Sequence, residues 1–434
     1  MTPTAIGLIG FAVLLVLLAL RMPIGIAMTL VGIVGIAVLN STDAALRILG
    51  EFPYAYSSVY ALSVIPLFVL MGNFASVSGL GRDLYQAAYA WIGHRPGGLA
   101  SATILACAGF AALSGSSVAS AATMGKVALP EMRRYDYDPR LATGAVAAGG
   151  TLGILIPPST AMIVYALLTE QSIGKLFLAG FLPGVLLAAL FIVTIAIIAH
   201  LRPELGPRGA VHDLRQRFAA LGRAWALFAI VVVVIGGIYL GIFTETEAAA
   251  IGAMLALLFA VLRGSLSARA LSTALLDTMR TTAFVFLILI GAHVLTPFLA
   301  LTGIPTDLAA ALSALQLPPL AVLAVFLVIY ILLGMFLEGF AMLVLTLPIV
   351  FPIITALGFD PVWFGIFVVI VLEMGLISPP VGINVFVVKG VAGDVPMGQI
   401  FAGIMPFWIA MIACVGLLVA FPQIALVLPE TMFR

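Results

Sequence analysis

The sequence predicts an all-α polytopic membrane protein that contains an inverted-topology repeat, and three observations support this fold class. The 434-residue chain is 63% hydrophobic and only 9% charged, against about 25% charged for soluble domains. Apolar stretches recur from residue 4 to residue 429, so one signal peptide or one anchor cannot account for them. Finally, six residues that restrict the backbone recur at a single offset.

Hydropathy predicts ten membrane spans and two re-entrant hairpins. Two apolar stretches, 99–133 and 318–356, are too long for one span and are interrupted near their middles, at 114–117 and 334–339. We therefore expect hairpins that turn at mid-depth. The predicted spans cover residues 4–20, 23–39, 59–80, 139–168, 175–199, 223–243, 247–262, 281–303, 361–388 and 398–428.

Basic residues predict the orientation of the chain. Fifteen of the 19 Lys and Arg residues fall on one side if both hairpins re-enter, whereas Arg47, Lys175 and Arg434 fall on the other. The positive-inside rule makes the crowded side cytoplasmic. The N-terminus and the C-terminus are then both predicted to be periplasmic, and the two halves have opposite orientations.

The internal repeat has an offset of 222 residues. Inverted repeats of this kind are the architecture of many secondary transporters. The matched pairs are Pro130 with Pro352, Asp138 with Asp360, Pro139 with Pro361, Gly153 with Gly375, Pro157 with Pro379, and Pro158 with Pro380.

The repeat and the hairpins divide the chain into six predicted parts. These are scaffold spans of the first repeat (1–80), an interfacial arm helix (81–98), the first hairpin and broken span of a transport domain (99–199), a cytoplasmic linker (200–222), scaffold spans of the second repeat (223–317), and the second hairpin and broken span of the transport domain (318–434).

Each half has a span that cannot stay a regular helix, because a double proline follows a glycine. Unwound backbone at membrane depth exposes carbonyl oxygens, which are hard ligands suited to sodium. Each break, together with its hairpin tip, is a candidate sodium site, although a proline kink without a ligand is the alternative. Site one comprises Ser114, Gly115, Ser116, Ser117, Gly153, Ile154 and Pro157; site two comprises Gly334, Glu338, Gly339, Gly375, Ile377, Ser378 and Pro379.

A substrate carboxylate is expected between the two sites, near the pseudo-two-fold axis. The half-helix that begins near Val118 directs its positive end toward the first tip. The alternative role of the serines at the tip is close packing of helices.

Glutamates inside the membrane are functional candidates. Glu338 lies opposite Ser116 in the offset and Glu373 lies opposite Thr151, and each is either a proton carrier or a structural carboxylate. Glu245 and Glu247 are expected to cap a helix, and His293 is expected to be a packing residue.

An enzyme is not expected. Ser116 could be a nucleophile only with a general base within reach, and the one deep histidine, His293, is assigned to the scaffold. No His-Glu-x-x-His zinc motif occurs in the sequence. Sodium is therefore the only metal expected, as a coupling ion, and no cofactor is predicted.

Several motifs resemble one transporter family over nearly the whole chain. They lie at residues 114–117, 121–125, 153–159, 246–250, 334–338 and 375–384. With these motifs the sequence resembles the large membrane subunit of tripartite ATP-independent periplasmic (TRAP) transporters. A stand-alone carboxylate or ion permease of the same ion-transporter superfamily is the alternative.

The resemblance implies an elevator-type fold and sodium-coupled uptake of an organic acid, such as a C4-dicarboxylate or a sugar acid, across the bacterial inner membrane. It implies two partners, a periplasmic substrate-binding protein and a small four-helix membrane subunit, which we expect as a separate chain because the sequence starts at the first large-subunit span. The substrate residues that we expect are Ser116, Ser117, Pro158, Ser159, Pro380 and Asn384.

Overall fold

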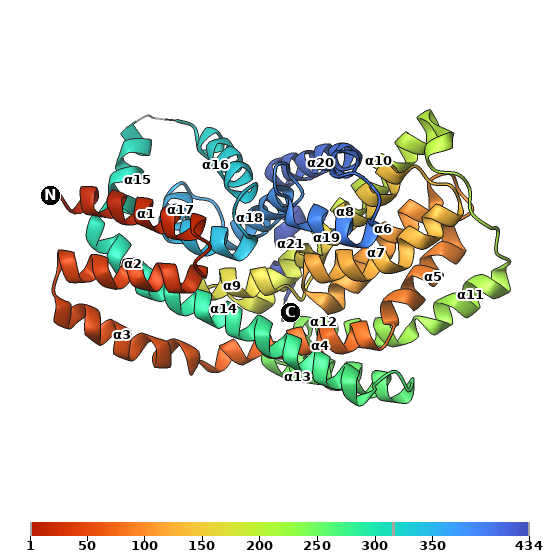
Figure 1. The fold of residues 1–434 in the computed structure, drawn as a ribbon, viewed down its shortest axis with the longest axis horizontal. Coiled ribbons are helices and arrows are strands. Elements are labelled where there is room, and N and C mark those ends of the chain that lie inside the picture. Colours follow the sequence, from red (N-terminus) through yellow and green to blue (C-terminus); the bar gives the residue numbers. More distant parts are fainter. Residues whose placement is uncertain (1, 315–316, 433–434) are drawn as a thin grey trace.

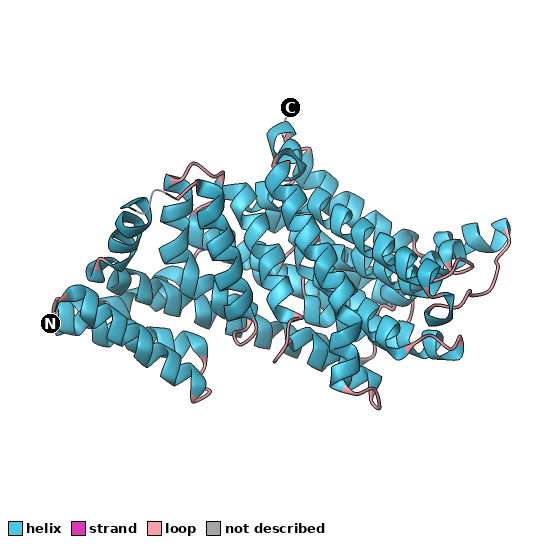
Figure 2. Ribbon diagram, turned by 90° about the horizontal axis from the view of Figure 1, so that it is seen from above, coloured by secondary structure: helices cyan, strands magenta, loops and turns pink. Residues whose placement is uncertain are grey.

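The computed structural model describes residues 2–314 and 317–432, and every regular element in them is a helix (Figures 1 and 2). The N-terminus lies at one end of the long axis, and the C-terminus projects from one face near the middle of that axis. Within these residues, seven helical segments are long and apolar enough to cross a membrane, or eight if α11 and α12, bent by 51°, form one span. The predicted all-α membrane fold is therefore confirmed.

The first repeat contains α1 to α10. Its helices are α1 (Pro3–Ala19), α2 (Ile24–Leu39), α3 (Thr42–Ser57), α4 (Val64–Val77), α5 (Leu80–Ile92), α6 (Gly98–Ser114), α7 (Ser117–Arg134), α8 (Pro139–Leu155), α9 (Thr160–Thr169) and α10 (Ile173–Leu201).

A linker with the short helix α11 (Leu214–Arg223) leads to the second repeat. Its helices are α12 (Trp225–Tyr239), α13 (Glu245–Leu262), α14 (Ala268–Thr302), α15 (Ile304–Ala314), α16 (Pro319–Gly334), α17 (Gly339–Ala356), α18 (Pro361–Leu376), α19 (Ile383–Ala392), α20 (Met397–Ala420) and α21 (Gln423–Thr431).

The offset of 222 residues holds at the level of whole helices. It brings α7 onto α17 at matching bounds, and α8 onto α18 and α9 onto α19 to within one residue. The packing is also exchanged between the halves, because α7 packs on α19 whereas α17 packs on α9. In Figure 1 the two hairpins lie on either side of α9, α18 and α19.

The Asp-Pro pairs recur because they start equivalent helices. Asp138 Oδ1 accepts the backbone N–H of Arg140 at 2.8 Å, and Asp360 Oδ1 accepts those of Val362 and Trp363 at 2.8 and 2.9 Å. The proline that follows occupies the first helical position, where its missing N–H costs no hydrogen bond.

Several element boundaries differ from the prediction. The span predicted at 281–303 is the longer helix α14, which starts at Ala268. The span predicted at 398–428 ends at Ala420 and is followed by the separate helix α21. Two unpredicted helices, α3 and α15, and a helix within the linker, α11, are also present.

These differences have physical causes. Helix α3 is amphipathic, so a search for continuous apolar runs passes over it. In the second repeat, the segment equivalent to α3 is continuous with the apolar run that follows it, and the two together form α14. Helix α15 occupies the position in the second repeat that the arm helix α5 occupies in the first.

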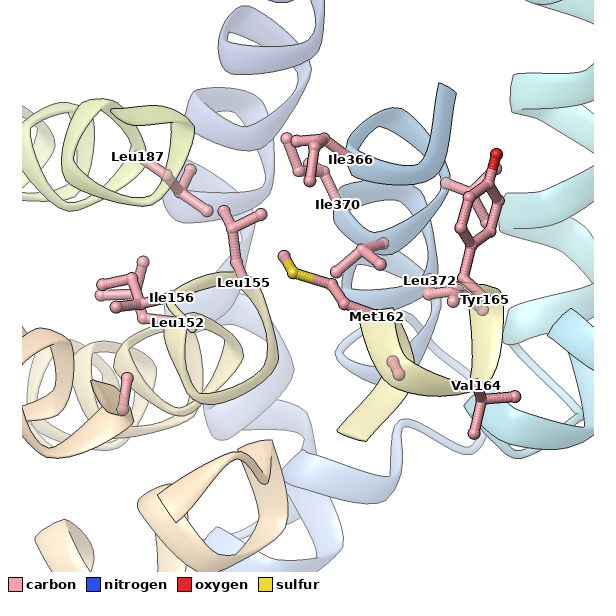
Figure 3. Close-up of a cluster of buried hydrophobic side chains, with 14 of the residues drawn as sticks. Leu152, Leu155, Ile156, Met162, Val164, Tyr165, Leu187, Ile366, Ile370 and Leu372 are labelled. Atoms are coloured by element: carbon pink, nitrogen blue, oxygen red, sulfur yellow. The ribbon is translucent and has the colours of Figure 1, made fainter. Parts of the chain in front are cut away.

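The buried core positions the first break. Figure 3 shows Leu155 of α8 and Met162 of α9 on either side of the break, facing Ile366 and Ile370 of α18, with Leu187 of α10 closing the cluster. All five side chains are buried. The two halves of the broken span are thus held by packing against the second repeat.

Helices α2 and α14, and helices α4 and α13, pack closely along each other (Figure 1). A Cβ added at Gly32 would lie 2.8 Å from the carbonyl oxygen of Val294, so this contact requires glycine.

Candidate functional site

The first hairpin tip lies directly against the first break. Gly115, whose φ is 60°, closes the turn between α6 and α7. Its carbonyl oxygen accepts a hydrogen bond from Thr160 Oγ1 at 2.9 Å. A Cβ at Gly153 would lie 2.5 Å from the carbonyl oxygen of Ser116. The predicted pairing of this tip with this break is therefore present in the structure.

The serines at this tip have different partners. Ser116 is the N-cap of α7 and accepts the N–H of Ala119 at 3.3 Å. Ser114 Oγ lies 2.7 Å from Ser120 Oγ. Helix α4 also reaches the tip, since a Cβ at Gly72 would lie 3.0 Å from the carbonyl oxygen of Ser114.

The second tip and the second break meet in the same way. A Cβ at Gly375 would lie 2.6 Å from the Cα of Gly334. Glu338 is the N-cap of α17, and its Oε2 accepts the N–H of Ala341 at 3.3 Å. Gly339 lies more loosely, with Leu376 as the nearest atom to an added Cβ, at 3.7 Å.

Both breaks free backbone carbonyls for the same reason. In a regular helix the carbonyls of Gly153 and Ile154 would accept from residues 157 and 158, which are prolines without an N–H. The carbonyls of Gly375 and Leu376 face Pro379 and Pro380 in the same relation, although Gly375 gains the N–H of Ser378 at 3.0 Å. Each break also contains a cis peptide bond between its two prolines.

A small cavity of about 80 Å³ lies between the two tips and the two breaks. Ten of its thirteen lining residues form five pairs related by the 222-residue offset, so the pseudo-two-fold axis passes through it. The pairs are Ser116 with Glu338, Ser117 with Gly339, Val118 with Phe340, Ile154 with Leu376, and Ala161 with Ile383; the other lining residues are Thr160, Leu372 and Glu373.

The polar lining of this cavity is asymmetric. The first repeat contributes the hydroxyls of Ser116, Ser117 and Thr160, whereas the second contributes the carboxylates of Glu338 and Glu373. Glu373 is 1% exposed and lies next to Ser117. Nevertheless, neither of its carboxylate oxygens has a hydrogen-bond partner among the described residues.

Some predicted residues lie outside the cavity lining. Ser378 Oγ donates to the carbonyl of Met374 at 2.6 Å and accepts from Trp408 Nε1 at 3.0 Å. Asn384 is fully buried, and neither of its side-chain polar atoms has a partner within residues 2–314 and 317–432. Ser159 caps α9 by accepting the N–H of Met162 at 3.3 Å.

Sequence reasoning did not name six of the lining residues, Thr160, Ala161, Phe340, Leu372, Leu376 and Ile383. Thr160 follows the break, and its hydroxyl donates to the carbonyl of Gly115. The feature of the sequence that could have indicated it is a hydroxyl residue at the start of the half-helix after the break. Leu372 precedes Glu373 and lines the cavity with it. An apolar residue in an apolar helix carries no signal of its own.

The remaining polar candidates have structural partners. Glu247 completes a capping box with Thr244, as expected. Glu245 instead accepts the N–H of Gly174 at 2.8 Å, so it caps α10 rather than its own helix. His293 Nδ1 lies 2.8 Å from the carbonyl oxygen of Leu289, and its ring packs against Tyr56 at 3.6 Å between centroids.

Residues 11–424 match the family model described as "Tripartite ATP-independent periplasmic transporter, DctM component". The chain belongs to this family. It is thus a transporter permease of the membrane rather than an enzyme, and it contains the hairpins and breaks described above.

Two relatives and one solved structure illustrate the similarity. The C4-dicarboxylate TRAP transporter large permease protein DctM of Pseudomonas aeruginosa is 38% identical, over 86% of this chain and 87% of that protein. The sialic acid TRAP transporter large permease protein SiaM of Vibrio cholerae is 33% identical, over 95% and 96%. The Alcanivorax borkumensis YdaH transporter, at 16% identity, shares the fold with a TM-score of 0.65 over 88% of this chain and 90% of that one.

Proposed function

We propose that this permease takes up an organic acid across the bacterial inner membrane, driven by sodium, and that the acid binds in the cavity between the two hairpin tips. The observation that carries the proposal is the lining of this cavity by both tips and both breaks, related by the repeat. Relatives are named for C4-dicarboxylate and sialic acid, so the substrate class that we propose is carboxylates, including dicarboxylates and sugar acids.

The charges of the cavity support a coupling cation. No Lys or Arg is among its lining residues, whereas two glutamates are. A carboxylate substrate placed beside these side chains would be repelled unless cations or protons neutralise them. The carbonyls freed by the two double prolines are oxygen ligands of the type that sodium uses. We therefore expect at least two sodium ions per transport cycle, one at each break.

The transport movement that we propose is an elevator. The hairpins, α8, α9, α18 and α19 would move as one unit against a frame formed by α1 to α4 and α12 to α14. This division is supported by the exchanged packing of α7 on α19 and α17 on α9, which joins the halves of the moving unit.

Cross-linking tests the movement. Gly72 of the frame touches the first tip in this structure, so a cysteine pair that joins the frame near Pro66 to the hairpin near Val118 should block transport, and reductant should restore it. Full transport with the cross-link formed would contradict an elevator.

The partners that we propose are a periplasmic substrate-binding protein and a small membrane subunit on a separate chain. The relatives are named large permease proteins, which supports a second, smaller subunit. The orientation that we propose places the cation-rich face in the cytoplasm and both termini in the periplasm.

Transport in proteoliposomes tests the coupling. The complex of permease, small subunit and binding protein should accumulate the acid when sodium is higher outside, and a proton gradient without sodium should give no accumulation. Accumulation driven by protons alone would contradict sodium coupling and would assign the coupling role to Glu338 or Glu373.

A further inference from the structure

A second and much larger cavity, of about 870 Å³, lies along the part of α7 that is away from the first hairpin tip. It is bounded by the arm helix α5, the hairpin helix α7 and the linker helix α11, which lie together at one end of the molecule (Figure 1, right). No residue of the tip cavity contributes to it.

The lining of this cavity, which we call the arm cavity, is strongly cationic. Four basic side chains, Arg82, Lys126, Arg134 and Arg223, line it with a single carboxylate, Glu131. None of the four basic side chains forms an ion pair in the part of the chain that the structure describes. Elsewhere Arg133 and Arg263 do have acidic partners, Asp394 and Asp83. The arm cavity therefore has an excess of positive charge available to an anion.

Two side chains of the arm cavity also have buried polar atoms that a bound ligand could satisfy. The hydroxyl of Tyr85, 2% exposed, and Nδ1 of His212 have no hydrogen-bond partner among the described residues, and both side chains line the arm cavity. The neighbouring Tyr89, in contrast, has hydrogen-bond partners: its hydroxyl donates to the Tyr135 hydroxyl at 2.7 Å and accepts from the N–H of Ala210.

The helix next to the arm cavity also fits a membrane surface. Helix α11 turns Gln216, Ala219, Ala220 and Arg223 toward the cavity. Its opposite face carries Leu214, Phe218 and Leu221, which are 66%, 61% and 38% exposed. The helix also carries Arg215, Arg217 and Arg223, and a short helix that combines an exposed apolar face with several arginines is typical of the membrane interface.

We propose that the arm cavity binds the headgroup of an anionic phospholipid, next to the membrane surface in which the apolar face of α11 lies. The orientation predicted from the basic residues places this cavity at the cytoplasmic leaflet, where anionic lipids attract clustered Lys and Arg. The exposed apolar face of α11, with Leu214 and Phe218, favours a lipid over a soluble phosphate, because it anchors this helix in the membrane interface, next to the lipid headgroups. A bound headgroup would join α7 of the hairpin to α5 and α11 of the arm and linker.

The test uses the full permease with its small subunit, purified in a neutral detergent. Cardiolipin, phosphatidylcholine and inorganic phosphate are added separately, and the melting temperature and the lipid adducts in native mass spectrometry are measured. Cardiolipin should raise the melting temperature and form adducts, whereas phosphatidylcholine and phosphate should do neither.

A matched pair of double variants localises the site. Arg82→Gln with Arg223→Gln removes two cavity cations and should weaken cardiolipin binding by about 30-fold. Arg215→Gln with Arg269→Gln removes the same charge from exposed positions outside the arm cavity and should leave binding unchanged.

Three outcomes would overturn the proposal. They are equal cardiolipin binding by the two double variants, an equal response to phosphatidylcholine, and a response to inorganic phosphate as large as that to cardiolipin, which would indicate a site for soluble anions. None of these outcomes depends on transport, so the proposed uptake function would stand or fail separately.

Discussion

The two repeats place equivalent residues around one cavity but differ in the chemistry they bring to it. At the first tip Ser116 caps α7 with a neutral hydroxyl, whereas at the second tip Glu338 caps α17 with a carboxylate. At the breaks, Thr151 of the first repeat donates to the carbonyl of Ala148 at 2.6 Å, whereas its counterpart Glu373 has no partner among the described residues.

The two repeats therefore share a backbone shape but differ in the charge of their polar side chains. Backbone-determining residues are matched, so both halves form a tip and a break, but the polar side chains are not matched. A cap without charge leaves the positive end of α7 available to an anion, whereas Glu338 neutralises the equivalent end of α17. We infer that the first repeat contacts the substrate carboxylate and that the second repeat contributes more to cation binding.

The largest effect is expected from substitutions that prevent the close fit between tip and break, which both repeats share. Gly153→Leu and Gly375→Leu should each abolish transport, because each adds a side chain where a Cβ would already lie within about 2.6 Å of the neighbouring tip. Initial uptake rates in proteoliposomes give the measurement, with the amount of folded protein checked by size-exclusion chromatography.

Gly236→Leu is the control for these glycines, since nothing lies within 4 Å of a Cβ at Gly236. Rates near wild type in either the Gly153 or the Gly375 variant would mean that the tip and break of that repeat need not fit closely.

The next effect concerns the charge difference at the breaks. Glu373→Gln should raise the sodium concentration for half-maximal uptake by about 10-fold or more, since an interaction with a buried charge contributes about 1.5–3 kcal/mol. Thr151→Val, at the equivalent position, should change this concentration little, because Thr151 bonds only within its own helix. An equal effect of the two substitutions would remove the proposed division between the repeats.

A smaller effect is expected at the two caps. Ser116→Ala removes the tip hydroxyl that lines the cavity and should raise KM for the acid by about fivefold, the effect of one hydrogen bond of about 1 kcal/mol. Glu338→Gln keeps an acceptor but removes the charge, so it should change the sodium dependence more than KM. Uptake measured over a grid of acid and sodium concentrations separates the two, and the opposite pattern would reverse the assignment of the repeats.

The sequence predicted the parts of this fold that depend on backbone restriction. Double prolines and Asp-Pro pairs located both breaks and both helix starts, because those residues exclude most other conformations. The sequence did not predict α3, α11 or α15, which lie outside the long apolar runs. It also did not show that Ser378 would be engaged by Trp408, because the contact joins residues 30 positions apart through packing that no local pattern encodes.

The smallest effect is expected at an ion pair that joins α7 to the end of α19 and has no equivalent between α17 and α9. Arg133 at the end of α7 forms an ion pair with Asp394, which follows α19, at 2.5 Å; the corresponding ends of α17 and α9 carry Thr355 and Ser172 instead. Asp394→Asn should lower the melting temperature only slightly at neutral pH, because both side chains are exposed.

The stabilisation that this ion pair contributes depends on pH. A hydrogen bond from its own backbone, then the Arg133 hydrogen bond and charge, lower the pKa of Asp394 below its usual range. Its contribution is therefore present above the pKa of an unfolded aspartate and is lost as the pH falls through the lowered pKa. The gap in melting temperature between the wild type and Asp394→Asn should close on acidification. A gap that stays constant from neutral to acidic pH would show that the substitution acts through packing rather than through the ion pair.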